Sequence, residues 1–224
     1  MTSAKTTDLT TAIAAERQEL AGILAGLSAT SWNAPTLCVG WRVREVVAHI
    51  TMPFRYAGGH FVAELLKAGG NFHKMADRSA RRDASVLSTE ELTAALRDNA
   101  HHPWKPPGAG QAGALSHDVI HGLDVTVALG IERRVPADRL LAVLATADSG
   151  RARRHFGVDL HGIELRADDL DWTLGSGEPL GGSAQDLLLV LCGRRLPPGR
   201  LHGEPAGRFT AAADSPGCAD IGDI

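Results

Sequence analysis

The sequence predicts a mainly α-helical protein: a helical bundle over residues 1–155, a small α+β segment over residues 156–210 and a flexible tail over residues 211–224. Three observations carry this prediction. Apolar residues recur at helical spacing through most of the first segment, whereas after Gly157 they alternate with polar residues, as they do in strands. Beyond Pro197 the chain is rich in glycine, proline and alanine, and we expect its end to fray.

Helices are expected where apolar residues follow the 3.6-residue period, and the first segment contains five such stretches. They begin at Leu9, near Arg42, at Ser88, near Ala112 and after Pro136. Thr7 or Asp8 is expected to cap the first helix, and Ser88 with Glu91 matches a capping box. Pro53 is expected to kink or split the second helix, because proline removes a backbone donor and clashes with the preceding turn.

Three other stretches stand out by their composition. Ser31–Trp41 is expected to be a structured loop, since it contains proline and glycine. The basic stretch Arg78–Arg82 is interpreted as a solvated loop. From Ala112 to Leu129 the only charged residues are Asp118 and Asp124. A helix that is apolar on nearly every side is a buried one, so this stretch is predicted to lie in the core.

The C-terminal segment is expected to combine strands with one helix. Two short strands are predicted over residues 163–165 and 170–174, where apolar residues alternate with polar ones. The glycines around them, at positions 175, 177, 181 and 182, are interpreted as turn residues. Ser183 and Asp186 match a second capping box, which predicts a helix from there to Gly193.

The composition excludes several classes of protein. The net charge of −3 lacks the basic excess of nucleic-acid binders, so no nucleic-acid partner is expected. Three widely spaced cysteines argue against a disulfide framework and favour a reducing compartment. No apolar run approaches the roughly 20 residues that a membrane span requires, and the N-terminus does not resemble a secretory signal. We therefore expect a cytoplasmic protein without a membrane partner.

Three histidines are candidates for a metal site. His117 and His121 are one helical turn apart on the predicted buried helix, and Asp124 lies on the same face. A carboxylate there can accept the free ring N–H of a ligating histidine. His49 lies beside the apolar face of the second helix, and three imidazoles with an open position are typical of catalytic zinc. The alternative is that these are hydrogen-bonded core histidines.

Two further patterns involve the same region. The run from His117 to His121 resembles the HExxH helix of metalloproteases, but Asp118 stands where that motif has its glutamate. The shorter side chain would misplace the attacking water, which disfavours a protease. Cys38 is a candidate nucleophile, but nothing in the sequence indicates a lowered thiol pKa, so a packed thiol is favoured.

Taken together, three stretches resemble the mycothiol-dependent maleylpyruvate isomerase family, within the wider DinB-like group of metal-binding helical bundles. The first is a W-x-x-P-T-x-C-x-G-W motif, Trp32–Trp41, followed by Val46–Val47–Ala48–His49. The second is His117-x-x-x-His121-x-x-Asp124, which ends in Leu129–Gly130. The third stretch lies in the C-terminal segment and consists of four pieces in order along the chain: Leu170–Asp171–Trp172, then Gly175 and Gly177, then Asp186–Leu189, and finally Gly193–Arg194.

This resemblance implies a DinB-like four-helix bundle with a small C-terminal α+β unit that helps to close the site. It implies a divalent metal ion, most often Zn²⁺, at His49, His117 and His121, and mycothiol as thiol cosubstrate. It also implies a catalytic arginine, for which Arg194 is the best match and Arg195 the neighbouring one. In the isomerase itself a glutamate stands at the position of His117, which affects the expected substrate more than the expected metal.

The predicted function is therefore a thiol-dependent metalloenzyme that acts on a small electrophile. Isomerase-like addition–elimination and S-transfer both fit these residues, and the protein is expected to be a monomer or a homodimer. The alternative from another class is a non-catalytic metal-binding or ligand-sensing DinB-like protein.

Overall fold

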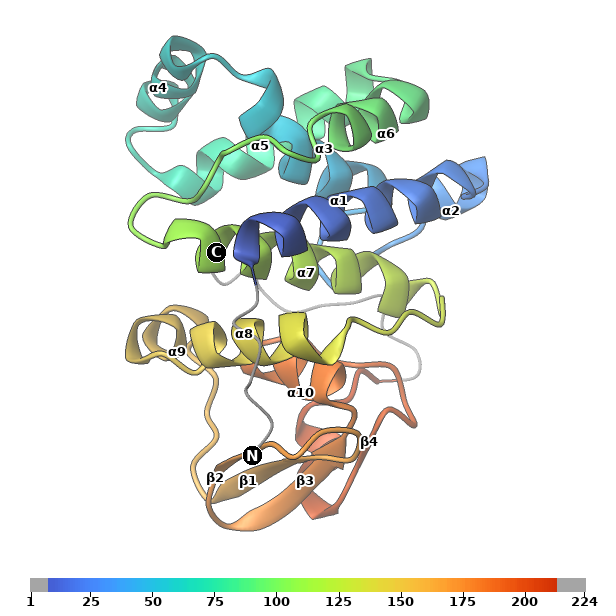
Figure 1. Ribbon diagram of the computed structural model, residues 1–224, viewed down its shortest axis with the longest axis vertical. Coiled ribbons are helices and arrows are strands. Elements are labelled where there is room, and N and C mark those ends of the chain that lie inside the picture. The colour runs from blue at the N-terminus through green and yellow to red at the C-terminus, as the bar shows by residue number, and fades with distance from the viewer. Residues whose placement is uncertain (1–7, 213–224) are drawn as a thin grey trace.

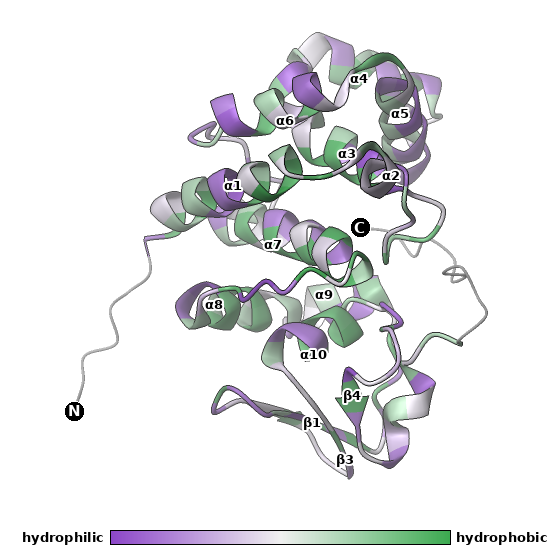
Figure 2. Ribbon diagram, turned by 90° about the vertical axis from the view of Figure 1, so that its right-hand side faces the viewer, coloured by the Kyte–Doolittle hydropathy of each residue, from purple (hydrophilic) through white to green (hydrophobic). Residues whose placement is uncertain are grey.

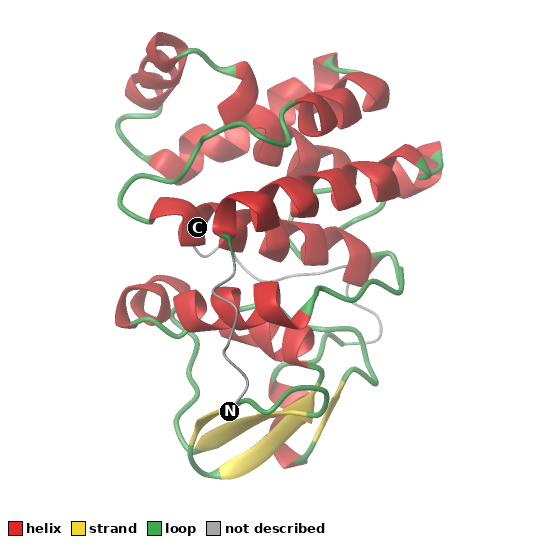
Figure 3. Cartoon of the chain, in the orientation of Figure 1, coloured by secondary structure: helices red, strands yellow, loops and turns green. Residues whose placement is uncertain are grey.

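Residues 8–212 are described by the structure, a computed structural model in which layers of helices are stacked above a sheet (Figures 1 and 3). The helices are α1 (Leu9–Ala25), α2 (Ala29–Trp32), α3 (Val43–Arg55), α4 (Gly58–Lys67), α5 (Phe72–Val86), α6 (Thr89–Asp98), α7 (Gly110–Ala128), α8 (Ala137–Ala147), α9 (Gly150–Phe156) and α10 (Ala184–Leu191). The strands are β1 (Ile163–Ala167), β2 (Thr173–Gly175), β3 (Glu178–Gly182) and β4 (Leu201–His202), and a 3₁₀ helix spans Glu204–Arg208.

Four of these helices form a closed bundle. α1 packs against α6 and α7, and α3 packs against the same two helices, so each member has two neighbours. Large apolar side chains from these helices meet in the core. Among them are Leu20, Val46, Ile50, Leu92 and Leu96. The predicted DinB-like bundle followed by a small α+β unit is confirmed.

α7 lies in the middle of the molecule, between the other bundle helices and the layer of α8 and α10 (Figure 2). Its apolar composition follows from this position, because partners cover it on both sides. The prediction of a buried helix over this stretch is confirmed, although the helix begins at Gly110 rather than near Ala112.

Helix boundaries in the first segment follow the capping signals. Asp8 accepts a hydrogen bond from the Thr10 N–H, and Ser88 with Glu91 forms the predicted capping box. Pro53 lies near the end of α3, which stops at Arg55, and α4 begins in a new direction after two intervening residues. The predicted second helix is therefore split.

The loop interpretation of Arg78–Arg82 is wrong, because these residues lie in α5, which packs against α3. The buried face of α5 consists mostly of small or polar side chains. These are Met75, Ala76, Ser79, Ala80, Asp83 and Ala84. A face of this kind leaves no period of large apolar residues in the sequence, so the helix was missed.

The C-terminal sheet has the strand order β2-β1-β3-β4, and β1 pairs parallel to β3 and antiparallel to β2. The two predicted strands are present, but β3 and β4 were not expected. Gly181 and Gly182 lie within β3, so their interpretation as turn residues is wrong. A Cβ at Gly181 would lie 2.1 Å from the ring of His202 on β4, so a side chain at this strand position would displace that exposed ring.

One apolar core joins the bundle to the C-terminal segment. It contains residues of α7, α8 and α10 together with residues of the sheet, such as Leu123, Leu144, Leu165 and Leu188. No helix within residues 8–212 has the length and apolar character needed to cross a membrane. The division at residue 155 stays a prediction, and the expected tail lies largely outside the described residues.

Candidate metal centre

The three candidate histidines meet between α3 and α7. His49 is on α3, and His117 and His121 are on α7. Their ring centroids are 4.9–5.1 Å apart, and each histidine offers one ring nitrogen within 4.8 Å of the other two. The Nε2 atoms of His49 and His117 are 3.1 Å apart. The sequence therefore identified three residues that the fold brings together from two distant helices.

This arrangement fits a metal ion. Zinc–nitrogen bonds of about 2.0–2.1 Å in a tetrahedral geometry place two ligand nitrogens about 3.3 Å apart. Within the described residues, the buried His121 Nε2 has no hydrogen-bond partner. Such an orphaned nitrogen beside two other imidazoles is a candidate metal-ligand position, because buried polar atoms are ordinarily satisfied.

The protonation of the cluster also suits a cation. Burial, and then the neighbouring histidines, lower the pKa of His49 well below its usual value. Burial lowers the pKa of His121 to about 4, against the opposing effect of Asp124. Both imidazoles are therefore neutral near pH 7, which is the form that binds metal.

Asp124 supports His121 as the spacing predicted. Nδ1 of His121 lies 3.0 Å from Oδ2 of Asp124. An Nδ1–H that donates to this carboxylate leaves Nε2 of His121 facing the other two histidines. Burial alone would raise the pKa of Asp124. The charge of Arg194 and the hydrogen bonds from His121 and Arg194 outweigh it and hold that pKa well below its usual range.

Arg194 lies against Asp124 rather than in an open position. Its Nε donates to Asp124 Oδ1 and its Nη2 to Asp124 Oδ2, both at 2.9 Å. Its Nη1 donates to the Cys192 carbonyl at 2.8 Å. The sequence identified both side chains but not their pairing. The catalytic role expected of Arg194 stays a prediction.

Cys38 belongs to the same cluster. Its Sγ donates to Asp124 Oδ2 at 2.9 Å, and Arg194 Nη2 lies 3.4 Å from that sulfur. The backbone N–H of Leu37 donates to the Asp124 carbonyl at 3.2 Å, which fixes the loop against α7. Burial, and then the charge of Asp124, raise the pKa of the Cys38 thiol well above its usual value. The thiol is thus a protonated donor, unlike an activated nucleophile.

Cys38, His121 and Asp124 also present ligand atoms within 4.8 Å of one another. A cation at that point would compete with Arg194, whose guanidinium already occupies both oxygens of Asp124. The three histidines are therefore the better metal site.

His117 has a carboxylate partner of its own, which the sequence analysis did not identify. Its Nδ1 lies 3.0 Å from Oδ1 of Asp118, and Arg17 Nε donates to Oδ2 of Asp118 at 2.7 Å. The position of Arg17 on α1 is the feature of the sequence that could have indicated its role. It stands in the buried series Ile13, Arg17, Leu20 and Leu24, where the helical period predicts an apolar residue.

Two tryptophans flank the histidines. The Trp41 ring centroid is 5.1 Å from that of His49, and its Nε1 donates to Asp77 at 2.8 Å. The half-buried Trp104 lies on the loop before α7, with its ring centroid 5.1 Å from that of His117. The two indoles therefore pack against rings of the histidine cluster from two different loops.

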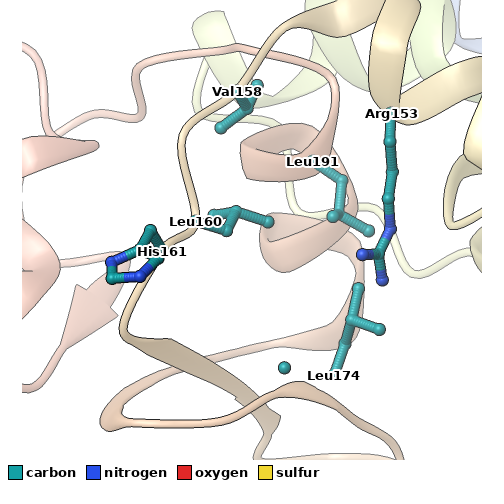
Figure 4. A pocket seen from close by; sticks show the side chains of 7 residues that line it. Arg153, Val158, Leu160, His161, Leu174 and Leu191 are labelled. Carbon is teal, nitrogen blue, oxygen red and sulfur yellow. The ribbon is translucent and has the colours of Figure 1, made fainter.

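A separate cavity of about 290 Å³ lies between α9, α10 and the sheet (Figure 4). Aliphatic side chains such as Leu160, Leu174 and Leu191 line it, and Arg153 reaches into it from α9. Arg153 is ion-paired with Asp148. None of the predicted site residues lines this cavity.

The sequence profile of the family described as mycothiol maleylpyruvate isomerase N-terminal domain matches residues 13–125, half of the chain. Two relatives are uncharacterized proteins of Mycobacterium tuberculosis, from strains CDC 1551 / Oshkosh and ATCC 25618 / H37Rv. Each is 26% identical, over 81% of this chain and 83% of the relative.

Among solved structures, the crystal structure of a histidine-to-alanine mutant of the mycothiol-dependent maleylpyruvate isomerase has a TM-score of 0.54 and 12% identity. The match covers 91% of this chain and 94% of that one. At this identity the likeness shows a shared fold. The family match includes the three histidines and ends before Arg194.

Proposed function

The chain belongs to the family of the mycothiol maleylpyruvate isomerase N-terminal domain, and from this premise we propose that it is a thiol-dependent metalloenzyme. Mycothiol would be its cosubstrate and a small electrophile its substrate. The reaction would be an isomerase-like addition–elimination or an S-transfer. His49, His117 and His121 would hold a divalent ion, most suitably zinc, in the cytoplasm.

The single observation that carries this proposal is the convergence of three imidazoles, two of them buried and that of His117 partly buried, with ligand nitrogens within 4.8 Å. Three histidines with one open position are the ligand set of catalytic rather than structural zinc sites. Two of the three are supported by carboxylates of α7, as ligating histidines usually are. Hydrogen-bonded core histidines would not leave the ring nitrogen of His121 without a partner.

The charges around the histidines favour an anion at the open position. Asp118 and Asp124 are each ion-paired with a buried arginine, Arg17 and Arg194. The two pairs are formally neutral, and the three imidazoles add no negative charge, so the charge of a divalent ion would not be reduced by its surroundings. A glutamate at position 117, as the resemblance describes for the isomerase, would remove one unit of that charge.

A divalent ion bound there would stabilise the thiolate form of the cosubstrate. In the isomerisation, the thiolate sulfur adds to one carbon of a cis double bond conjugated to a carbonyl, and the displaced electron pair moves to the carbonyl oxygen. Rotation about the resulting single bond follows. Return of the electron pair breaks the C–S bond and releases the trans product and the thiolate. In S-transfer, the same sulfur would instead displace a leaving group as its anion.

The residues of this chain would orient and shield that chemistry. Asp124 would hold His121 by its Nδ1 proton, and Trp41 with Trp104 would limit water at the site. Arg194 is proposed to stabilise the negative charge that develops on the carbonyl oxygen. A substrate oxygen would compete for Arg194 Nη2 with Cys38 Sγ, and sulfur is the weaker acceptor.

The second candidate function is a non-catalytic metal-binding or ligand-sensing protein. All three nitrogens of the Arg194 side chain donate hydrogen bonds to groups of the protein itself, as those of a structural arginine do. This observation favours the second function. The two functions differ in turnover.

The test is thiol-dependent consumption of maleylpyruvate, followed by loss of its absorbance, with zinc-loaded protein and mycothiol. The proposal expects catalytic turnover that requires both the thiol and the ion. His121→Ala should abolish it, and His161→Ala, on a distant loop, should not. Stoichiometric zinc without turnover of maleylpyruvate or of an S-acceptor panel would favour the sensing function.

A further inference from the structure

We infer that Asp118 is the positioning residue of His117 and that Arg17, from the first helix, holds Asp118 in place for that task. This inference rests on the proposed function, because it concerns one of the three proposed ligands. It adds to that function the pair of Arg17 and Asp118, which are 101 positions apart in the sequence and belong to no common motif.

The contact with His117 fixes the direction of the imidazole. Asp118 is buried, and its two oxygens have different partners, His117 Nδ1 at 3.0 Å and Arg17 Nε at 2.7 Å. A carboxylate paired with a guanidinium only accepts hydrogen bonds, so His117 must carry its proton on Nδ1. In the neutral imidazole, Nε2 is then the nitrogen without a proton, and it lies 3.1 Å from His49 Nε2.

Arg17 joins three elements that surround the cluster. Its Nε binds Asp118 on α7, and its Nη1 donates to the carbonyl of His102 at 2.9 Å and that of Ala100 at 3.3 Å. That turn leads into the loop that carries Trp104. The guanidinium also lies over the Phe54 ring, 4.6 Å from its centroid, and Phe54 follows Pro53 on the helix of His49.

A neighbouring ion pair shows what a purely structural pair looks like. Glu16, the residue before Arg17 on α1, is equally buried and is paired with Arg133 and Arg139. Among residues 8–212, the hydrogen bonds and ion pairs of Glu16 reach Arg133 and Arg139 and no histidine of the cluster. The two pairs therefore have similar burial, and they differ in that only the Arg17–Asp118 pair ends on a proposed ligand.

The first test reads the tautomer of His117 directly in metal-free protein, by ¹⁵N NMR of the histidine rings. Wild type is expected to show His117 protonated on Nδ1. Asp118→Ala should move the proton toward Nε2, the form that imidazole prefers in water. Glu16→Gln is the matched control and should leave the tautomer unchanged. Nε2–H in wild type, or the same tautomer in Asp118→Ala, would overturn the inference without bearing on whether metal binds.

The second test measures zinc affinity by competition with a chromophoric chelator. Asp118→Asn, which preserves the shape of the side chain, should weaken binding by about 10- to 100-fold, as for other carboxylates behind a ligating histidine. Glu16→Gln should lower thermal stability without that loss of affinity. Unchanged affinity in Asp118→Asn, with tight binding in wild type, would refute the positioning role but leave the metal site standing. Absent zinc binding in wild type would refute the proposed function instead.

The part played by Arg17 is tested by a double-mutant cycle. If Arg17 holds Asp118 in its productive orientation, Asp118→Asn should cost less affinity in an Arg17→Gln background than in wild type. An equal or larger cost would show that Arg17 does not act through Asp118. The visible absorption of the cobalt-loaded proteins, which depends on the coordination geometry of the ion, should change with Asp118→Asn and not with Glu16→Gln.

Discussion

Arg194 binds Asp124 through two parallel hydrogen bonds, Nε to Oδ1 and Nη2 to Oδ2, each 2.9 Å long. The pair is buried and connects the end of α10 to the helix that carries His117 and His121. Because Asp124 Oδ2 also lies 3.0 Å from His121 Nδ1, the C-terminal segment is linked to the three-histidine cluster through one carboxylate.

Replacement of Asp124 by asparagine should weaken zinc binding. The amide keeps an acceptor for His121, but it loses the charge that raises the basicity of the ligand, so we expect affinity to fall about 10- to 100-fold. Chelator competition measures the change. Asp168→Asn, at an exposed carboxylate on the sheet side, is the control and should bind zinc as wild type does.

Arg194→Lys separates the catalytic role from a structural one. Lysine retains the charge but not the planar fork, so we expect turnover to fall by on the order of 100-fold, as when one charge-stabilising donor is lost. Zinc content should be retained. Arg195→Ala removes the adjacent exposed arginine and should leave turnover unchanged. Full activity in Arg194→Lys together with lost activity in Arg195→Ala would transfer the role to Arg195.

Arg194→Ala should behave differently from Arg194→Lys, because it leaves Asp124 as a buried carboxylate without its cation. Breaking a buried pair on one side typically costs about 3–5 kcal/mol. We therefore expect a clearly lower free energy of unfolding in urea. Stability equal to that of wild type would mean that the pair contributes little, and that Arg194 is free to serve a substrate.

Cobalt binding should quench part of the tryptophan fluorescence, since Trp41 and Trp104 lie against the ligand rings. Trp104→Phe and Trp41→Phe should each reduce the quenched fraction. Trp172→Phe, in the turn before β2, removes a distant indole and should leave the amplitude of quenching intact. Quenching carried by Trp172 would place the ion elsewhere.

The metal-free protein should lose stability on mild acidification. Burial lowers the pKa of His121 to about 4, whereas the unfolded chain has an ordinary histidine pKa of about 6.5. The unfolded state therefore binds more protons between these values, and the free energy of unfolding decreases as pH falls from 6.5 to 4. His121 alone contributes on the order of 3 kcal/mol. His49 acts in the same direction.

Urea titrations across this pH range, on chelator-treated protein, measure that decrease. His121→Gln, which does not titrate, should show a shallower slope than wild type. A free energy of unfolding that is constant or rises on acidification would contradict the neutral, buried state of the cluster.

Large apolar residues and capping side chains were enough to predict the four bundle helices and α10. Their periods are visible in short windows of sequence, and the histidines follow from the helices that carry them. α5 was missed because its buried face is made of alanine, serine and aspartate around Met75. β3 was missed because Leu180 is its one buried residue with a large apolar side chain, and its other two buried residues are Gly181 and Gly182.

The polar pairs of the site were the hardest part to predict. Arg17 meets Asp118 across 101 positions, and Arg194 meets Asp124 across 70. No local period encodes such a contact. For Arg17, however, a charged residue in the buried series of α1 was a visible sign that a partner of opposite charge must lie in the core.

Whether His49, His117 and His121 hold a metal ion is tested most simply by the metal content of the purified chain, measured by inductively coupled plasma mass spectrometry. We predict close to one zinc ion per chain in wild type. His49→Ala, His117→Ala and His121→Ala should each lose most of it, whereas His202→Ala, on the distant sheet, should retain it. Zinc retained near one per chain in any of the three cluster variants would show that the residue is not a ligand, and a wild-type protein that binds no divalent ion would contradict a metal site at these histidines.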